Sequence, residues 1–358
     1  MVKNYLLILP FCVAFQIVTA QTFLTADGPG NTYELINSVL APGHNAVEAP
    51  DCKHSSFGRH IEEVFDNALN KYVFKFHIHT HEDDDRCINF DRQRNEIKTY
   101  DKSPDNLKAV FQEVVRYKWK FKLDAAFQPS AKFTHIHQIK AVGGSESSMP
   151  QITLTPREAS PNKMQLRYAQ NSSQTTIHET DLAPFLGVWV EATETILYDE
   201  IGQGRYELSI KEVTTGNTIF YFNDNSIRMW KTDADFQRPK WGIYRSLDDS
   251  ISLRDEAVLF ADFVIEELDN FTLVSSNTIV ENIEIIVFPN PATDRLFFSE
   301  DIYQNFETIN IFNESGQLVS TKEITTDHIS TTDLSSGTYL IEFKTVDIRT
   351  KPIRILIK

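Results

Sequence analysis

The chain is poor in basic residues. It has 35 Lys and Arg against 50 Asp and Glu, which gives a formal net charge of −15 over 358 residues. A general nucleic-acid binder needs a basic face, so this balance argues against that class, and we expect no nucleic-acid partner. The same balance makes any local cluster of Lys and Arg informative.

Long apolar runs are missing except at the N-terminus. Residues 5–18 are almost wholly apolar, follow Lys3 and are closed by the small residue Ala20. This pattern predicts a signal peptide over residues 1–20, with the mature chain starting at Gln21. A membrane anchor is the alternative, but the run is short for a span and no second one follows, so we expect no membrane span.

Cysteine is scarce. Of three cysteines, Cys12 falls in the predicted signal peptide, which leaves Cys52 and Cys87. An even pair in an exported chain predicts a disulfide, worth about 3–4 kcal/mol in the loop-entropy model. Two unrelated buried thiols are the alternative.

Helical patterns are also sparse, and only residues 103–118 suggest a short helix, capped by Ser103 or Asp105. Short alternating segments separated by turn-rich pieces fill the chain from about residue 70 to 272. They lie at 72–79, 118–127, 151–156, 164–170, 186–198, 204–213, 218–223 and 257–268. This spacing predicts an all-β fold, an antiparallel sandwich or jelly roll.

A boundary falls at 273–285, where the aromatic residues stop, and strand-sized segments with Gly and Asn turns follow. We therefore expect a larger domain over 21–272, a linker over 273–285 and a small β-sandwich over 286–358. Three landmarks of this tail resemble the C-terminal sorting domain of the type IX secretion system of Bacteroidetes. They are Phe288-Pro289-Asn290-Pro291, Gly316 in NESGQLV, and Leu334-Ser335-Ser336-Gly337-Thr338-Tyr339, with Lys358 at the end. The resemblance implies a secreted or cell-surface protein that uses the type IX machinery.

Three strand-like segments of the larger domain carry many polar residues, at 90–100, 133–140 and 238–247. Alternation along a strand puts every second side chain on one face. One face then presents Arg92, Arg94, Glu96 and Lys98 from the first segment, Gln138 and Lys140 from the second, and Lys240, Gly242 and Tyr244 from the third. Such a face is costly to bury without partners but suits a groove for an anionic ligand.

Local charge supports a groove. Residues 92–140 contain eleven Lys and Arg but five Asp and Glu, inside an otherwise acidic chain. A basic groove on an acidic protein would concentrate a polyanion. A solvated sheet edge, with lysines used against aggregation, is the alternative.

The three segments resemble those of the jelly-roll polysaccharide lyases, typified by the alginate lyases of family 7, which carry R-x-E-x-R, Q-I-H and K-A-G-x-Y strands. The matches are Arg94-Asn95-Glu96-Ile97-Lys98, Gln138-Ile139-Lys140 and Lys240-Trp241-Gly242-Ile243-Tyr244. Lys98 and Lys140 depart from the pattern, which has Arg and His there. RQRNE, THIHQIK and RPKWGIYRSL are closer to the glucuronan lyases of family 20 and the ulvan lyases of family 28. The likeness spans residues 55–270 and implies a concanavalin-like β-jelly roll.

The resemblance implies β-elimination at a uronate of an anionic algal polysaccharide, with ulvan favoured and glucuronan or alginate as alternatives. Arg94 and Gln138 would neutralise the uronate carboxylate, and Tyr244 would transfer the proton. Lys240 and Arg245 are the candidates for lowering the pKa of Tyr244. Residues expected to bind substrate are Lys140, Lys240, Arg92, Lys98, Glu96, Arg245, His137 and His79.

Histidines raise the question of a second proton carrier. Alternation turns Phe133, His135, His137 and Ile139 away from the groove. Losing the family's His at Lys140 fits a syn elimination at glucuronate, in which one tyrosine serves both proton transfers. His79 or His137 as a second group is the alternative.

A metal is not expected. His77, His79 and His81 precede an acidic run, but no spaced partner ligand stands out, so half-exposed strand residues are the preferred interpretation. The cluster Glu82 to Asp85 lacks the Gly-containing spacing of a Ca²⁺ loop, so a structural Ca²⁺ is only an alternative and no cofactor is required.

Two other function classes remain open. A non-catalytic carbohydrate-binding sandwich would need no tyrosine beside a carboxylate clamp. A glycoside hydrolase would need two carboxylates on the groove face, for which Glu96 and Glu191 are the candidates.

Overall fold

The computed structural model describes residues 21–271, 278–280, 287–299, 302, 306–314, 317–344, 348–350 and 352–358. The predicted signal peptide and most of the predicted linker lie outside these residues. Among the described residues, no helix has the length and apolar character needed to cross a membrane.

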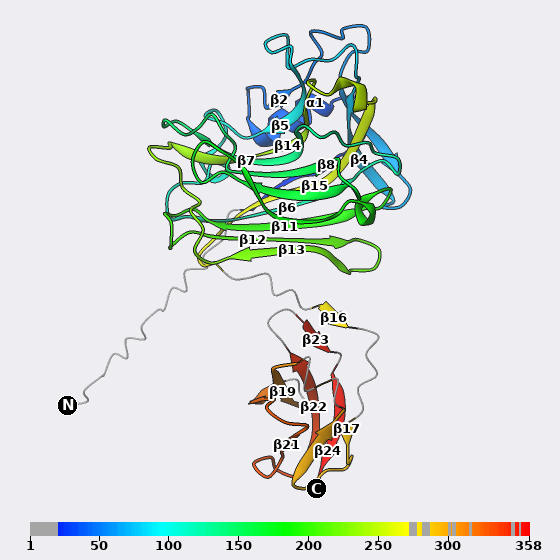
Figure 1. Ribbon diagram of the computed structural model, residues 1–358, viewed down its shortest axis with the longest axis vertical. Helices are drawn as coiled ribbons and strands as arrows, with labels where there is room; N and C mark the ends of the chain where they lie inside the picture. The colour runs from blue at the N-terminus through cyan, green and yellow to red at the C-terminus, as the bar shows by residue number, and fades with distance from the viewer. Residues whose placement is uncertain are drawn as a thin grey trace, which may run out of the picture. The chain divides into compact units, whose positions relative to one another are not determined.

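Two antiparallel sheets make up most of residues 21–271 (Figure 1). The first contains β1 (Gln21–Leu24), β3 (Ile61–Asp66), β4 (Lys71–Ile78), β6 (Val114–Lys122), β11 (Val190–Leu197), β12 (Arg205–Glu212), β13 (Thr218–Asp224) and β15 (Glu256–Leu268). Its strand order is β13-β12-β11-β6-β15-β4-β3, with β1 also paired to β15.

The second sheet contains β2 (Val47–Glu48), β5 (Arg92–Lys98), β7 (Thr134–Val142), β8 (Ile152–Arg157), β9 (Lys163–Tyr168), β10 (Thr175–Asp181) and β14 (Phe236–Ser246). Its strand order is β10-β9-β8-β7-β14-β5-β2. The chain passes from one sheet to the other along β4, β5, β6 and β7. Later, β14 enters between β5 and β7 while β15 enters between β4 and β6. This wrapping confirms the predicted all-β jelly roll.

The alternation of the sequence explains how the sheets pack. In β6, Tyr117, Trp119 and Phe121 are buried, whereas the lysines between them are half-buried. Trp119 meets Trp241 of β14 with ring centroids 6.0 Å apart, so the inner faces of the two sheets form one aromatic core.

Helices are short. The described residues contain α1 (Thr32–Leu40), whose Ile36 and Leu40 are buried one turn apart, and the 3₁₀ turns η1 (Asp105–Leu107), η2 (Ala183–Phe185) and η3 (Ser250–Ser252). The helix predicted over 103–118 is wrong beyond η1. Its later part is β-branched and aromatic, and it pairs as β6 instead.

The last part of the chain forms further strands. A six-stranded sheet contains β16 (Thr278–Val280), β19 (Thr308–Asn313), β20 (Leu318–Glu323), β22 (Gly337–Lys344), β23 (Ile348–Thr350) and β24 (Ile353–Ile357). A three-stranded sheet contains β17 (Val287–Phe288), β18 (Arg295–Phe298) and β21 (His328–Ser330). Buried residues such as Ile309, Ile341 and Phe343 give this C-terminal part a hydrophobic core of its own. The chain divides into two compact units, the second of which holds residues 272–358 with 188–193 and 207–223. The domain boundaries given above stay a prediction.

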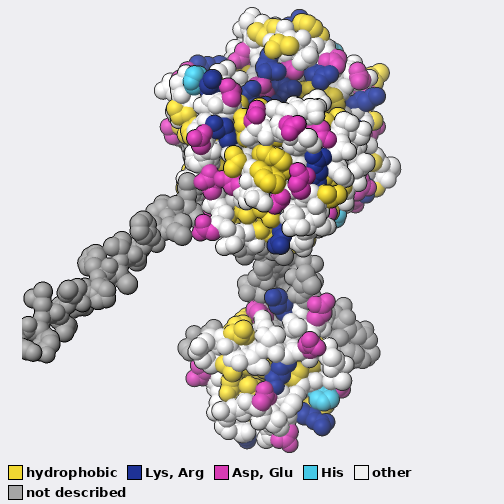
Figure 2. All heavy atoms as spheres, turned by 90° about the vertical axis from the view of Figure 1, so that its left-hand side faces the viewer, with side chains coloured by type: hydrophobic (Ala, Val, Ile, Leu, Met, Phe, Trp, Pro, Cys, Tyr) yellow, Lys and Arg dark blue, Asp and Glu magenta, His cyan; other side chains and the backbone are white. Residues whose placement is uncertain are grey.

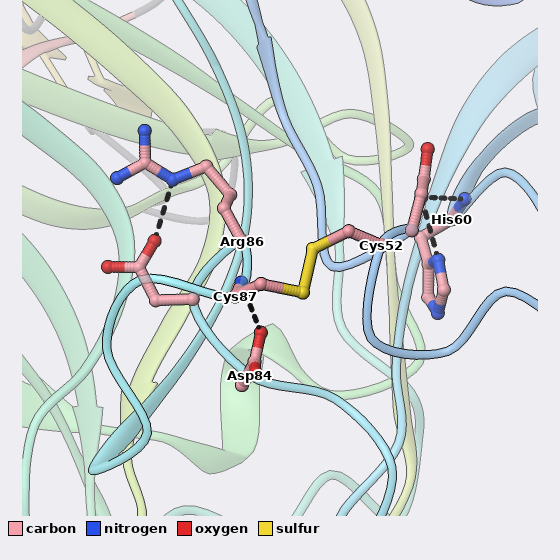
Figure 3. Close-up of a disulfide and its surroundings, with 7 residues drawn as sticks. Cys52, His60, Asp84, Arg86 and Cys87 are labelled. Carbon is pink, nitrogen blue, oxygen red and sulfur yellow. Dashed lines mark hydrogen bonds and ion pairs between the residues drawn. A yellow bond between two sulfur atoms is a disulfide. The ribbon is translucent and has the colours of Figure 1, made fainter.

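The predicted disulfide is confirmed. Cys52 and Cys87 are bonded, with Cα atoms 6.3 Å apart (Figure 3). The bridge ties the segment before β3 to the loop between β4 and β5, and the backbone N–H of Cys87 donates to Asp84 at 2.8 Å.

Replacing both cysteines with serine should lower the free energy of unfolding by about 4 kcal/mol, because the bridge closes a loop over a sequence separation of 35 residues. Urea unfolding of the double variant measures this loss. A change below about 1 kcal/mol would contradict the stabilising role, and an intact mass with two free thiols would contradict the bond itself.

Candidate functional site

A cleft of about 730 Å³ opens on the second sheet. Its lining residues are Glu48, Arg86, Arg92, Arg94, Lys132, Phe133, His135, Gln138, Lys140, Ser148, Met149, Pro150, Arg157, Arg167, Ser172, Ser173, Gln174, Arg238, Lys240, Tyr244, Ser246 and Asp248. Nine are Lys or Arg and two are acidic, so the cleft is strongly positive inside an acidic chain. Figure 2 shows Lys and Arg side chains gathered in the upper part of the face that it presents.

Strand register brings the three sequence motifs together. In the pairing of β5 with β14, Arg94 stands opposite Tyr244 and Lys98 opposite Lys240. In the pairing of β14 with β7, Lys240 stands opposite Gln138. Directly opposed residues share a face of a sheet, which is why segments about 150 residues apart in sequence line one cleft.

A β-bulge changes which histidine faces the cleft. Trp241 pairs with His137 but Tyr244 pairs with His135, so β14 holds one residue more than β7 between these pairs. Gly242 lies in the bulge at φ 144°, and a Cβ there would stand 2.1 Å from the carbonyl oxygen of Asn95. His135 therefore shares the face of Tyr244.

The expectation that Phe133 and His135 face away from the groove is consequently wrong. Both line the cleft, and their rings lie 5.0 Å and 5.9 Å from the ring of Tyr244. Strict alternation would put Gln138 and His135, which are three residues apart, on opposite faces of β7. The bulge between their partners Lys240 and Tyr244 changes the register, so both face the cleft.

Tyr244 lies between two arginines. The guanidinium carbon of Arg94 is 3.7 Å from the centre of the Tyr244 ring, and Nη1 of Arg92 donates to the Tyr244 hydroxyl at 2.9 Å. Burial raises the pKa of Tyr244 above its usual value, and Arg94 and Arg92 offset part of this rise. The hydroxyl therefore keeps its proton at neutral pH, whereas the sequence suggested a lowered pKa.

Arg245 does not take part. It points away from the cleft and is buried, where its Nε donates to Gln93 and one Nη donates to the backbone carbonyl of Arg254, both at 2.8 Å. The neighbours that favour a tyrosinate at Tyr244 are thus Arg94 and Arg92 rather than Arg245.

Two buried glutamates hold the floor of the cleft. Nζ of Lys240 lies 2.5 Å from Glu48 and 2.6 Å from Glu96, while Nη1 of Arg94 lies 2.5 Å from Glu96. Gln138 also donates its amide to Glu96. Burial alone would raise the pKa of Glu48, but Lys240 and the other surrounding cations hold it well below its usual range. Glu48 and Glu96 therefore stay ionised and fix the cations in place.

The Nη2 of Arg94 is available to donate to a ligand. Its Nε binds Asp85 at 2.9 Å and its Nη1 binds Glu96. Among the described residues, its Nη2 has no hydrogen-bond partner. The side chain is therefore held rigidly with a free edge in the cleft.

Other cleft cations lack acidic partners. Among the described residues, no carboxylate lies within ion-pair distance of Lys140, Arg157, Arg167 or Arg238. Burial and the neighbouring Lys240, Arg238 and Arg94 lower the pKa of Lys140 to about 7. A bound anion would relieve this mutual repulsion, which favours an anionic ligand.

His135 is held in one tautomer. Its Nδ1 lies 2.7 Å from Oγ1 of Thr155, and the Thr155 hydroxyl donates to Oγ1 of Thr153 at 3.3 Å. Thr155 thus accepts from Nδ1–H, which leaves the Nε2 of His135 as a proton acceptor. Burial and the cations Arg157 and Arg167 lower the pKa of His135 to about 3, so the imidazole is neutral.

The remaining predicted site residues lie elsewhere. Lys98 binds Glu48 at 2.7 Å, behind the cleft lining. His137 is buried between the sheets, where its Nε2 lies 2.9 Å from Glu194 and its ring 4.3 Å from that of Trp119. His79 belongs to a separate cluster. These residues, with Glu96 and Arg245, do not line the cleft, whereas Tyr244, Gln138, Arg94, Arg92, Lys140 and Lys240 do.

Several residues of the cleft lining were not predicted from the sequence. Glu48 comes from β2, Arg157 from β8 and Arg167 from β9, none of which carried a motif. The one usable signal was Gly242 inside a strand, because an isolated glycine there is typical of a bulge.

Residues 286–358 match the family model of the secretion system C-terminal sorting domain. This match confirms the predicted type IX sorting domain. It indicates that the protein is secreted or held at the cell surface. No curated protein sequence matches the chain.

Solved structures with a similar fold include three lyases. An endo-β-1,4-glucuronan lyase from the fungus Trichoderma reesei has 15% identity and a TM-score of 0.42, covering 57% of this chain and 86% of that one. A marine PL-14 alginate lyase from Aplysia kurodai has 8% identity and a TM-score of 0.48, covering 68% and 97%. A family 7 alginate lyase in complex with substrate has 15% identity and a TM-score of 0.44, covering 65% and 99%. At these values the likeness establishes neither the activity nor the substrate of this chain.

Proposed function

We propose that the protein is a secreted lyase that cleaves an anionic, uronate-containing polysaccharide by β-elimination, with ulvan as the substrate. The observation that carries this proposal is the row of Arg94, Tyr244 and His135 across three paired strands of a cleft with nine cations and two acids. The row combines a carboxylate-binding cation, a proton donor and a proton acceptor, which are the groups this reaction requires. We assign the chemistry to residues 21–272.

In the proposed reaction, Nη2 of Arg94 and the amide of Gln138 bind the carboxylate of the uronate. Their hydrogen bonds stabilise the negative charge that develops when the proton on C5 leaves. The C5 proton passes to a base, the C4–O4 bond breaks as a C4–C5 double bond forms, and the leaving O4 takes a proton. The product is an unsaturated uronyl oligosaccharide.

Tyr244 is assigned as the acid that protonates O4, because its raised pKa keeps the hydroxyl protonated. The Nε2 of His135 is assigned as the base. Its low pKa comes from burial and from nearby cations, and a bound uronate neutralises these cations and raises the basicity of His135. This assignment replaces the single-tyrosine mechanism that Lys140 suggested.

His135→Asn should lower kcat by about 10²-fold or more while KM changes little, because asparagine keeps a polar group but removes the proton acceptor. Steady-state kinetics on a soluble polymer measures the effect. His137→Asn is the matched control, with circular dichroism to check its fold, and should keep most of the rate. A normal kcat in His135→Asn would contradict the assignment of His135 as the base. Tyr244 would then transfer both protons.

Substrate binding should weaken as pH rises through the pKa of Lys140, which is about 7 in the free cleft. Lysine is cationic below its pKa and neutral above it, so the cleft loses one positive charge. We expect KM to rise about fivefold between about pH 6 and pH 8, which corresponds to about 1 kcal/mol for one charge contact. Lys140→Arg should flatten this rise, and an unchanged rise in that variant would contradict the role of Lys140.

The acidic residues of the cleft lining argue against the glycoside hydrolase alternative. Its lining acids are Glu48 and Asp248, and the strongly lowered pKa of Glu48 excludes that residue as a proton donor. Glu191 is absent from the lining. A purely binding sandwich remains the competing class.

Incubation with ulvan, glucuronan and alginate, followed by the absorbance of the unsaturated product, tests the proposal. Absorbance should rise fastest on ulvan. If absorbance rises on glucuronan or alginate alone, that polymer is the substrate instead of ulvan. If it rises on no uronate polymer, the proposed lyase activity is wrong.

A further inference from the structure

Three histidines and one aspartate converge beside the disulfide, away from the cleft lining. His54 and His60 come from the segment before β3, and His79 and Asp83 follow β4. One ligand atom from each of the four lies within 4.8 Å of every other. Nδ1 of His54 and Nε2 of His60 lie 3.0 Å and 3.1 Å from Oδ1 of Asp83, and Nδ1 of His79 lies 3.1 Å from Oδ2.

A second carboxylate orients the central imidazole. Nδ1 of His60 lies 2.8 Å from Oδ1 of Asp51, and Asp51 also accepts from the hydroxyl of Tyr33 at 2.9 Å (Figure 3 shows His60). With Nδ1 donating to Asp51, the Nε2 of His60 would present its lone pair to a cation bound at the centre of the cluster. A carboxylate behind a histidine is the usual support of a metal-bound imidazole.

The cluster is enclosed. The side chains of His60 and Asp83 are fully buried, and those of His54 and His79 are 16% exposed. The ring of Phe57 covers it, 4.4 Å from His79 and 4.8 Å from His60. The carboxylate of Asp83 is the shared partner of the three imidazoles and of the backbone N–H of His79, whereas a cation at the centre would use all four side chains as ligands.

We propose that His54, His60, His79 and Asp83 form a structural Zn²⁺ site. Tetrahedral zinc with ligands at about 2.0–2.1 Å requires ligand atoms about 3.4 Å apart, close to the His–Asp spacings present. Four protein ligands fill the coordination sphere, so the ion is structural rather than catalytic. Imidazole ligands exclude Ca²⁺ and Mg²⁺, which prefer oxygen.

The site revises the expectation that no metal binds. His79 was the one member of the histidine run that belongs to it, and its partners His54 and His60 lie about 20 residues earlier in the chain. His77 instead binds Glu62 at 2.8 Å. The sulfur atoms of Cys52 and Cys87 are bonded to each other and are not ligands.

The metal site would also support the cleft wall. The loop that carries Asp83 continues to Asp85, which binds Nε of Arg94 at 2.9 Å. The side chain of Gln93 donates to the backbone carbonyl of Asp83 at 3.0 Å. Fixing Asp83 therefore fixes the loop that orients Arg94.

Metal analysis of the full chain, purified without chelator and incubated with ZnCl₂, tests the site. We expect about one zinc per chain in the wild type and in His77→Gln, which changes a histidine on β4 two residues before His79. His54→Gln, which alters a partly exposed ligand on a loop, should retain almost none. Adding Zn²⁺ to chelator-treated wild type at about 100 times its dissociation constant should raise Tm by about 5–10 °C, and the shift should vanish in His54→Gln.

Cobalt gives a readout that does not depend on any variant. Co²⁺ in place of zinc should give the intense visible absorption of a tetrahedral site. Wild type that takes up no zinc and shows no shift in Tm would overturn the proposal, as would equal loss of zinc in His77→Gln and His54→Gln.

Discussion

Replacing Tyr244 with phenylalanine should lower kcat by about 10²–10⁴-fold with little change in KM, because the substitution removes the transferable proton and keeps the ring. The ring remains packed against Arg94 and Phe133, so the cleft should keep its shape. Initial rates of formation of the unsaturated product measure the loss, and binding of the polymer to the inactive variant checks that the cleft is intact.

A matched variant separates chemistry from the loss of a hydroxyl. Tyr168 lies on β9 of the same sheet and donates to the backbone carbonyl of Arg228 at 2.9 Å, outside the cleft lining. Tyr168→Phe should therefore keep kcat. A Tyr244→Phe enzyme with near-normal kcat would refute the assignment of the acid.

Glu96→Ala should lower the free energy of unfolding by about 3–5 kcal/mol, because it leaves Lys240 and Arg94 short of a buried counter-charge. Glu96 is 1% exposed and lies within 2.6 Å of both cations. This loss corresponds to a fall in Tm of about 6–20 °C. Thermal and urea unfolding followed by circular dichroism measure it.

The control is Glu62→Ala on β3, whose half-exposed carboxylate pairs with Lys75 and His77. An exposed ion pair contributes about 0–1 kcal/mol, so this variant should unfold almost as the wild type does. Equal losses for Glu96→Ala and Glu62→Ala would show that the buried network does not hold the cleft floor.

The strands and much of the cleft could be predicted because their signals are local. Alternation over 72–79 and 257–268 gives β4 and β15 within one residue at each end. The motifs around Arg94, Gln138 and Tyr244 each put their polar residues on one face, and the pairing of β5, β14 and β7 then joins these faces.

The rest depends on contacts that no local pattern encodes. His135 reaches the cleft only because the bulge at Gly242 gives β14 an extra residue, which reverses the expected face. The histidine cluster joins His54 and His60 to Asp83 through the fold of two loops. Loop geometry of this kind is set by tertiary packing and by the disulfide, not by periodicity.

The most direct test of the proposed reaction is digestion of ulvan in water labelled with heavy oxygen, followed by mass spectrometry of the products. A β-elimination adds no water to the cleaved bond. We expect new ends that carry an unsaturated uronate, lighter by one water than a hydrolysis product, with no heavy oxygen incorporated. Saturated products with one heavy oxygen for each cleaved bond would contradict it.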